Sequence, residues 1–417
     1  MKQNYNFDID KIKSLSTKEK FVRQKNLNLF LENGFPNKKN EDWKFTDLNS
    51  ILNKNFDNIT NDIKFDIKKN VKILNNFDHN YILLTNGILS SSNFQHEEND
   101  KIKIKDLKTE ELHESASSNS LNLLNYALST GGYFLEVFKN YKFKKPLVVY
   151  NYFSENLKNV ILNNRNQIKL NSGSELTSIE YTVDNSQNNF IKNTIDSISL
   201  DNNSIYKSIF IQNSKSNGYF YRHIKASLEN NSNYQNCIMT SGLKFNKTEI
   251  DVNLNKENCN CSILSALYIS EYEHQEIKTR INHYAPNCDS YQKIKNVINK
   301  NGKGVYQGKI FVKDVAQKTN AYQLSKALIL NDDAEFDAKP ELEIYADDVK
   351  CSHGSTSGSI DNDAIHYLMT RGIDAETAKQ LLINGFLNDI LDNISDLNIK
   401  FFLLGILEGQ INGHNKH

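Results

Sequence analysis

Short strand-like runs, separated by clusters of Asn, Ser, Asp and Gly, fill this chain from Tyr133 to Tyr345. No long helical pattern interrupts them, and roughly two hundred residues of short strands indicate a sandwich, a barrel or a solenoid. The length favours a solenoid, although no crisp sequence repeat selects among the three. The runs are Tyr133–Val137, Leu147–Tyr150, Ile205–Ile211, Tyr221–Leu228, Thr248–Leu254, Ser262–Ile269, Ile277–His283, Tyr291–Ile298, Gly304–Val312 and Tyr322–Leu330.

Helical patterns flank the strand-rich region on both sides. Near the start, Ser16 and Glu19 have the spacing of a capping box, and Gly34 ends the predicted helix. Past Ile360 the apolar period becomes helical, and Asp374 is the predicted N-cap of the second of three helices. The chain is long for one domain, so we expect three units. They are a helical and mixed unit at 1–130, a β core at 131–360 and a helical unit at 361–417.

One stretch near the end of the strand-rich region combines a strand pattern with two metal-binding side chains. Apolar and polar residues alternate over 341–346, as in a half-buried strand. Pro340 is expected to end the segment before it, because proline lacks a backbone donor. Cys351 and His353 follow two residues apart, so in an extended segment their side chains share one face. A thiol beside an imidazole indicates metal or sulfur chemistry.

Two such side chains do not complete a metal site. Structural zinc and iron–sulfur centres usually take four protein ligands, so the others would come from elsewhere in the fold or from another chain. The competing interpretation is a buried cysteine beside a hydrogen-bonded histidine at the end of a strand. The spacing of Cys351 and His353 leaves both interpretations open.

The composition narrows the class of protein and its compartment. Fifty basic and fifty acidic side chains cancel, so the chain has no overall attraction to nucleic acid or anionic membranes. Five irregularly spaced cysteines do not form a disulfide framework and fit a reducing compartment. Residues 1–10 lack a signal-peptide pattern, and the apolar run at 401–407 is too short to span a membrane. We expect a soluble cytoplasmic protein.

Nucleotide hydrolysis and an internal metal site have little support in the sequence. The glycine-rich stretch at 302–310 lacks phosphate-loop spacing, and Ile310 occupies the position of the required hydroxyl. Cys259 and Cys261 are expected on one strand face, but no second cysteine pair completes a metal site. Cys237 and Cys288 are expected within strands.

A carbohydrate-active solenoid enzyme is a further alternative. Such an enzyme needs two carboxylates flanking one bond, but Asp347 and Asp348 are adjacent and point to opposite faces of a strand. Glu341 and Glu343 share a face, yet this interpretation leaves the thiol–imidazole pair unexplained.

Several stretches of the chain resemble the SufB/SufD family, part of the SUF machinery that assembles iron–sulfur clusters. Residues 340–354 match the SufD-branch signature Pro-x-Leu-Glu-Ile-x-Ala-Asp-Asp-Val-Lys-Cys-Ser-His-Gly. SufB-type sequences have Glu-His-Glu-Ala in the region of 352–355 and no cysteine in place of Cys351, which favours the SufD branch. Other matching stretches are 36–46 (with Phe45 in place of the usual tyrosine), 302–308, 316–319, 328–330, 371–373 and 384–386.

The resemblance implies a mainly β fold with a right-handed parallel β-helix core between an N-terminal mixed or helical domain and a C-terminal helical domain. It also implies a non-catalytic scaffold that pairs with SufB through the core and docks the SufC ATPase through the C-terminal helices. His353, and with it Cys351, would hold iron or a nascent cluster transiently, shared with SufB, and no cofactor would be bound stably. The implied docking residues are Arg371, Gly372, Asn384, Gly385 and Phe386.

Two alternatives stay open within the family. The chain could act as a SufB-like or homodimeric scaffold, because a homodimer would bring two Cys351–His353 pairs together and supply four ligands. It could also be a purely structural subunit whose cysteine and histidine are core residues.

Overall fold

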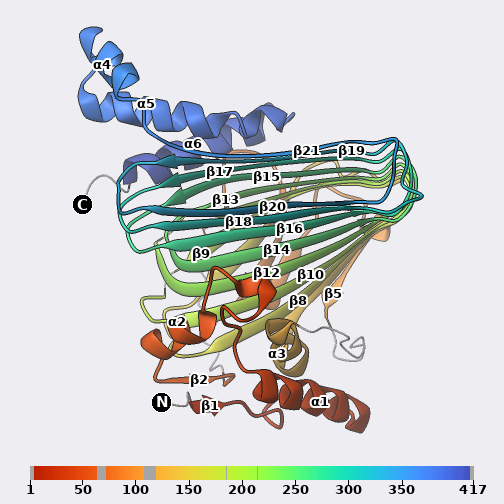
Figure 1. Cartoon of the computed structure of the whole chain (residues 1–417). Helices are drawn as coiled ribbons and strands as arrows, with labels where there is room; N and C mark the ends of the chain where they lie inside the picture. Colours follow the sequence, from red (N-terminus) through yellow and green to blue (C-terminus); the bar gives the residue numbers. More distant parts are fainter. Residues whose placement is uncertain (1–3, 63–71, 108–118, 185, 214, 414–417) are drawn as a thin grey trace.

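A parallel β-solenoid forms the centre of the molecule (Figure 1). The computed structural model describes residues 4–62, 72–107, 119–184, 186–213 and 215–413. From β8 to β19 each strand pairs in parallel with the strand two places later, so every turn contributes one strand to each of two facing sheets. The predicted mainly β, solenoid core with helical ends is confirmed.

The two sheets are named here by the parity of their strands. The even sheet consists of β6 (Gly131–Val137), β8 (Ile161–Leu170), β10 (Phe190–Leu200), β12 (Ser216–Leu228), β14 (Leu243–Leu254), β16 (His274–His283), β18 (Lys303–Val312) and β20 (Glu335–Ile344). The odd sheet consists of β7 (Leu147–Phe153), β9 (Glu175–Asp184), β11 (Ile205–Gln212), β13 (Asn233–Thr240), β15 (Asn260–Ile269), β17 (Asp289–Ile298), β19 (Asn320–Ile329) and β21 (Lys350–Ser359).

Side chains that point into the solenoid stack in register from turn to turn. Leu200, Leu228 and Leu254 form one such row in the even sheet, and His283 and Val312 continue it. All five are buried. Burial of successive rows removes apolar surface from water at every turn, and this is the main force that holds stacked turns together.

One tight bend on each of several turns uses an asparagine with left-handed backbone geometry. Asn203, Asn231, Asn258 and Asn287 have φ values of 59°, 56°, 57° and 59°. Asparagine tolerates this region because its short side-chain amide can form hydrogen bonds with nearby groups. The Asn231 amide donates to the Asn203 Oδ1 atom at 3.1 Å, and Asn258 donates to the Asn231 Oδ1 atom at 3.0 Å. These bends mark a repeat of about thirty residues that the strand pattern did not reveal.

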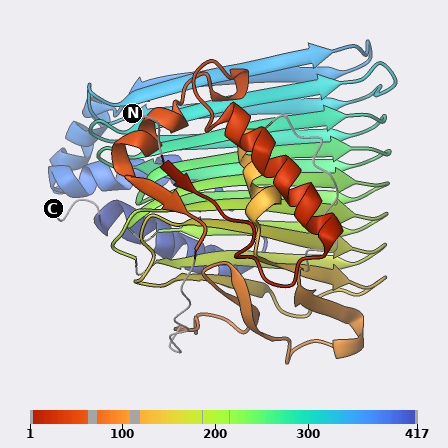
Figure 2. The ribbon, with the colours of Figure 1, turned by 90° about the horizontal axis from the view of Figure 1, so that it is seen from below.

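N-terminal elements cover the outer face of the even sheet (Figure 2). The predicted capping box is present, because Ser16 and Glu19 exchange hydrogen bonds at the start of α1. Trp43 is buried against Tyr221 and Phe245 of the sheet, as expected for a packing anchor. The elements are β1 (Asn4–Asn6), α1 (Thr17–Asn33), α2 (Leu48–Asn55), β2 (Asn58–Thr60) and α3 (Ser120–Leu128).

Three further strands flank the first turn of the solenoid. β3 (Asn80–Thr85) pairs in parallel with β7 and antiparallel with β4 (Ile88–Asn93). β5 (Ile102–Asp106) pairs antiparallel with β6. The N-terminal end of the solenoid is therefore covered by strands of mixed direction.

The chain ends in three helices, α4 (Asn362–Thr370), α5 (Ala375–Asn388) and α6 (Leu397–Gly413). α5 and α6 pack on the outer face of the odd sheet, whereas α4 has no buried residues and projects away from it (Figure 1). Asp374 caps α5 as predicted, and Gly372 has a φ of 87° in the bend between α4 and α5. Ile383 and Leu387 of α5 and Leu403 of α6 share one buried apolar cluster with the sheet. Among the described residues, no helix is long and apolar enough to cross a bilayer.

Three local expectations are wrong. Pro340 does not end a segment but lies within β20, opposite Gly308. Proline is tolerated there because β20 is the last strand of its sheet, where one side of the backbone needs no ladder hydrogen bond. Cys259 and Cys288 lie in bends directly before β15 and β17, not within strands. Cys237 does lie within a strand, β13.

Candidate functional site at the open end of the solenoid

The last turn of the solenoid ends in two strands with bare outer edges. Among the described strands, β20 pairs only with β18, and β21 pairs only with β19. The chain then leaves the sheets and enters α4 (Figure 1). An unpaired strand edge presents backbone donors and acceptors that another chain can bind. This end of the molecule is therefore a ready interaction surface.

β21 places the predicted ligand pair on this surface. Cys351 lies opposite Ala321 of β19, and His353 lies opposite Gln323. Gln323 points into the solenoid, because it is only 2% exposed and its amide donates to the Gly308 carbonyl oxygen of the facing sheet at 3.3 Å. One turn later, Cys351 and His353 occupy the inward positions that correspond to Ala321 and Gln323. No described turn covers them, so His353 is exposed and Cys351 is half-buried.

Cys351 packs against a small apolar cluster at the end of the solenoid. Ile310, Val312 and Ala321 are buried members of this cluster, and the thiol contacts its rim. Burial raises the pKa of Cys351, so the free side chain is a neutral thiol at pH 7. A metal ion that binds the sulfur displaces this proton, because metal ligation requires the thiolate.

His353 is the last member of a row of interior positions that is mostly polar. Buried polar groups normally have hydrogen-bond partners. Three atoms of the row, Asn236 Oδ1, Gln292 Nε2 and Gln323 Oε1, have none among the described residues. The row runs through Ser208, Asn236, Ile263, Gln292, Gln323 and His353.

The other half of the open end is apolar. Leu342 packs against the cluster that borders Cys351, and Ile344 is more than a third exposed. The inward positions of β20 lie opposite Gly304, Tyr306, Gly308, Ile310 and Val312 of β18. They are Phe336, Ala338, Pro340, Leu342 and Ile344. An apolar strip beside two potential ligands suits a surface that becomes buried when another chain docks.

This arrangement supplies two ligands and leaves the rest of a coordination sphere open. Among the described residues, no group of three or more His, Cys, Asp or Glu side chains is placed to hold a metal ion. A neutral imidazole binds iron near pH 7, and a thiolate does so once the metal replaces its proton. The pair can therefore form part of a shared site but not a closed one.

The predicted docking residues lie on the C-terminal helices and not at the open end. Arg371 and Gly372 are exposed in the bend after α4, where the Arg371 guanidinium donates to the Tyr367 hydroxyl at 3.0 Å. Phe386 is half-buried on α5, and the Lys295 ammonium of β17 lies 4.5 Å from the centre of its ring. Asn384 is half-buried and Gly385 is exposed on the same helix.

Two of the four carboxylates considered for carbohydrate chemistry, Glu341 and Glu343, are engaged in ion pairs. Glu341 pairs with Lys339 at 3.3 Å, and Glu343 pairs with Lys309. Both carboxylates lie on the strand face that points away from the interior.

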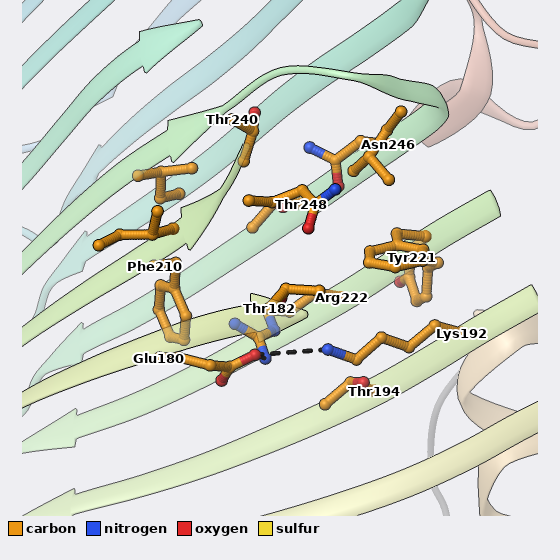
Figure 3. A pocket seen from close by; sticks show the side chains of 15 residues that line it. Glu180, Thr182, Lys192, Thr194, Phe210, Tyr221, Arg222, Thr240, Asn246 and Thr248 are labelled. Atoms are coloured by element: carbon orange, nitrogen blue, oxygen red, sulfur yellow. Dashed lines mark hydrogen bonds and ion pairs between the residues drawn. The ribbon is translucent and has the colours of Figure 1, made fainter. Parts of the chain in front are cut away.

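A second cluster of charged residues lies inside the solenoid and was not predicted (Figure 3). Glu180 of β9 pairs with Arg222 of β12 at 2.5 Å and with Lys192 of β10 at 3.3 Å. Arg222 also pairs with Asp196 at 3.2 Å. All four side chains are nearly buried. A cavity of about 40 Å³ adjoins the cluster, enough for a few water molecules.

Neighbouring charges decide the protonation of this cluster. Burial alone would raise the pKa of Glu180, but Arg222 and Lys192 lower it below its ordinary value. Burial raises the pKa of Asp196, despite the nearby guanidinium of Arg222. The sequence did contain a signal, because Lys192 and Asp196 alternate in step with the inward Ile198 and Leu200 of the same strand.

Two protein-family domains match this chain, and together they cover nearly all of it. Residues 152–386 match the SUF system FeS cluster assembly, SufBD core domain. Residues 3–149 match the SufBD protein N-terminal region. The first match includes the solenoid from β8 onward, the open end, α4 and most of α5.

Individual relatives agree with these family matches. The iron–sulfur cluster assembly protein SufD of Escherichia coli is 26% identical over 92% of this chain and 91% of its own length. An iron–sulfur cluster assembly SufBD family protein of Synechocystis is 27% identical over 56% of this chain and 52% of its own length. The SufD protein of Bacillus subtilis is 31% identical over 33% of this chain and 31% of its own length.

Proposed function

Because the chain belongs to the SufB/SufD family of iron–sulfur cluster assembly proteins, we propose that it is a non-catalytic scaffold whose open end completes a shared metal site with a SufB subunit. The observation that carries this proposal is the position of His353 and Cys351. They are inward residues of a last turn that no described strand covers. A SufB strand that pairs with this end would bring further ligands to them and bury the apolar strip of β20.

An open half-site suits a scaffold that must release its product. Iron or the nascent cluster is the cargo here, and it would be held transiently between two chains. Four ligands from one chain would bind the cargo more firmly, whereas separation of the two chains would remove half of the ligands at once. His353 is the principal ligand in this proposal, and Cys351 is either a second ligand, which would exchange its thiol proton for the metal, or a neighbour that does not bind it.

We further propose that the C-terminal helices dock the SufC ATPase. Arg371 and Gly372 are exposed in the α4–α5 bend and would contact SufC directly. Phe386 and Lys295 attach α5 to β17, so force applied to the helices would reach the solenoid through this contact. Nucleotide hydrolysis would then be a property of SufC. A closing movement of SufC would strain the contact between the paired open ends.

Anaerobic reconstitution of the chain with SufB and SufC tests the shared site. We expect His353→Ala to lower cluster formation at least about tenfold, because one lost ligand weakens a shared site strongly. His96→Ala is the matched control, since His96 is a half-buried histidine of the N-terminal region. Cluster yield from His353→Ala equal to that of the parent would refute the shared site. Stoichiometric uptake of a stable cluster by the chain alone would favour the homodimeric scaffold.

A capture assay with SufC tests the second surface. Removal of the helices would expose the apolar face of the odd sheet, so a point substitution is the better probe. We expect Arg371→Glu to abolish SufC capture, whereas Lys139→Glu, an equal charge reversal at an exposed position after β6, should not. Undiminished capture by the Arg371 variant would contradict docking at the α4–α5 bend.

A further inference from the structure

Successive turns of the solenoid bury a small polar side chain at the same place, directly after a tight bend. In three turns it is a serine whose hydroxyl donates at 2.6 Å to the carbonyl oxygen three residues earlier: Ser174, Ser204 and Ser232. Thr319 makes the same contact at 2.9 Å. The two intervening turns have cysteines, Cys259 and Cys288, at this place. Both cysteines are buried.

The two thiols lie side by side. The Asp289 amide donates to the Cys259 carbonyl oxygen at 2.9 Å, which puts the two cysteines in register on neighbouring turns. Their sulfur atoms lie 3.1 and 3.2 Å from the same atom, the Lys256 carbonyl oxygen. Neighbouring strands are about 4.8 Å apart, within the Cα separation that a disulfide bridges. The backbone therefore needs little movement to join them.

One thiol of the pair loses its proton more readily than the other. A hydrogen bond from Cys288 stabilises the Cys259 thiolate and lowers the pKa of Cys259 to about 7, while the same contact and burial raise the pKa of Cys288. Burial raises the pKa of Cys237 to about 12 and raises that of Cys261 as well. Cys259 is thus the most acidic of these thiols, and a thiolate is the nucleophilic form.

Only a thin layer of chain covers the pair. Glu257, Asn258 and Asn260 next to Cys259 are exposed, and so are Asn287 and Asp289 next to Cys288. Opening one bend would expose the sulfur atoms without unfolding the sheets.

We propose that Cys259 and Cys288 are a redox-active dithiol that closes to a disulfide when the protein meets a peroxide. The Cys259 thiolate attacks one peroxide oxygen and the O–O bond breaks, giving a sulfenic acid and hydroxide. The Cys288 sulfur then attacks the Cys259 sulfur, the S–O bond breaks, and the hydroxyl leaves as water. Overall, two thiols and one hydrogen peroxide give one disulfide and two waters. The bond would link consecutive turns of the solenoid and is independent of the assembly role proposed above.

Peroxide treatment of the full-length chain tests this assignment. Cys351→Ser serves as the parent, because the half-buried Cys351 could otherwise link two molecules. Exposure to hydrogen peroxide, denaturation, alkylation and peptide mass mapping should show one bond, between Cys259 and Cys288, and free thiols at Cys237 and Cys261. The melting temperature should rise on oxidation and return with a reductant.

Serine variants identify the role of each thiol. Cys259→Ser and Cys288→Ser are expected to fold, because serine occupies this place in three other turns. Without Cys288, Cys259 should accumulate as a sulfenic acid that dimedone labels, whereas without Cys259, Cys288 should stay unlabelled. Four free thiols in the oxidised parent, or a bond to Cys237 or Cys261, would overturn the proposal. So would equal labelling of the two single variants.

Discussion

His353 and Gln323 occupy equivalent positions on neighbouring turns, yet one is exposed and the other is buried. The difference comes from the next turn, which covers Gln323 and is absent beyond His353 among the described residues. The chemistry of an inward side chain in this fold therefore depends on its turn. Glu180 and Arg222 need each other because several turns enclose them, whereas His353 can keep its ligand nitrogen free.

His283 shows what burial does to an imidazole inside the solenoid. One ring nitrogen, Nε2, lies 3.0 Å from the Ser290 hydroxyl, and Nδ1 has no partner among the described residues. Burial lowers the pKa of His283 to about 4. The folded state thus binds a proton less readily than the unfolded chain, whose histidines titrate near pH 6.5. As the pH falls from 6.5 towards 4, the unfolded chain takes up a proton at His283 that the folded state does not bind. The free energy of unfolding therefore decreases over this range, and the full contribution of His283 is present only above pH 6.5.

We predict that His283→Gln removes this pH dependence, because glutamine can bond Ser290 but does not titrate. Between pH 7.5 and pH 5, the unfolding free energy of the parent should fall by about 2 kcal/mol relative to the variant. Urea unfolding at the two pH values measures the difference.

Glu273→Gln is the control of opposite sign. Burial raises the pKa of Glu273 to about 7, so its protonation stabilises the folded state as the pH falls from 7 towards 4.5. Parallel pH profiles of the parent and the His283 variant would contradict the prediction.

Most elements could be predicted from their sequence period, and the exceptions have a physical cause. β8, β9, β10 and β13 were missed, and in β8 and β10 the cause is that both faces of the strand mix polar and apolar residues. On the outward side, the Asn193 amide donates to the Leu121 carbonyl oxygen of α3 at 2.8 Å, and Asn125 donates to the Asn164 carbonyl oxygen at 3.0 Å. A strand that buries asparagines under a helix has no clear alternation to detect.

The candidate site, like the strands, could be predicted only in part. The shared face of Cys351 and His353 follows from their spacing alone, once the segment is extended. That this strand is the last one follows only from the helical period after Ile360 and from the pairing of β21. The buried cluster around Arg222 could not be assigned, because its ion pairs join strands that are up to 42 residues apart.

The bends can be tested as elements through their asparagines. We predict that Asn231→Ala lowers the unfolding free energy by about 1–2 kcal/mol. Alanine is strained at a φ of 56°, and the hydrogen bonds that the Asn231 side chain forms with Asn203 and Asn258 are lost. Asn231→Gly is the matched variant, since glycine accepts this φ without strain, and it should cost about half as much. Chemical denaturation of both variants gives the comparison. An equal loss in both would mean that backbone geometry does not limit the bend.

At the scale of the whole molecule, the solenoid is a row of turns that each contact only their neighbours. Stability in such a row is a sum over turns and over the interfaces between them, and a terminal turn has one interface fewer. The final turn has only β18 and β19 behind it, and both of its strands have many exposed or half-buried residues.

We predict that amide hydrogens of β20 and β21 exchange faster than those of β14 to β17, because opening a terminal turn disrupts a single interface. Addition of a SufB subunit should slow exchange in β20 and β21 and leave the central strands unchanged. Hydrogen-exchange mass spectrometry resolves these segments. Protection of the N-terminal strands β3 to β5 in place of β20 and β21 would contradict docking at the open end.

Among the described residues, antiparallel strands flank the first turn and helices cover both broad faces, whereas the two strands of the last turn have bare outer edges. Association through the open ends alone cannot form a polymer, because each contact uses the open end of both molecules. The proposed docking through this end would therefore join two chains and could not extend into a filament through the same surface.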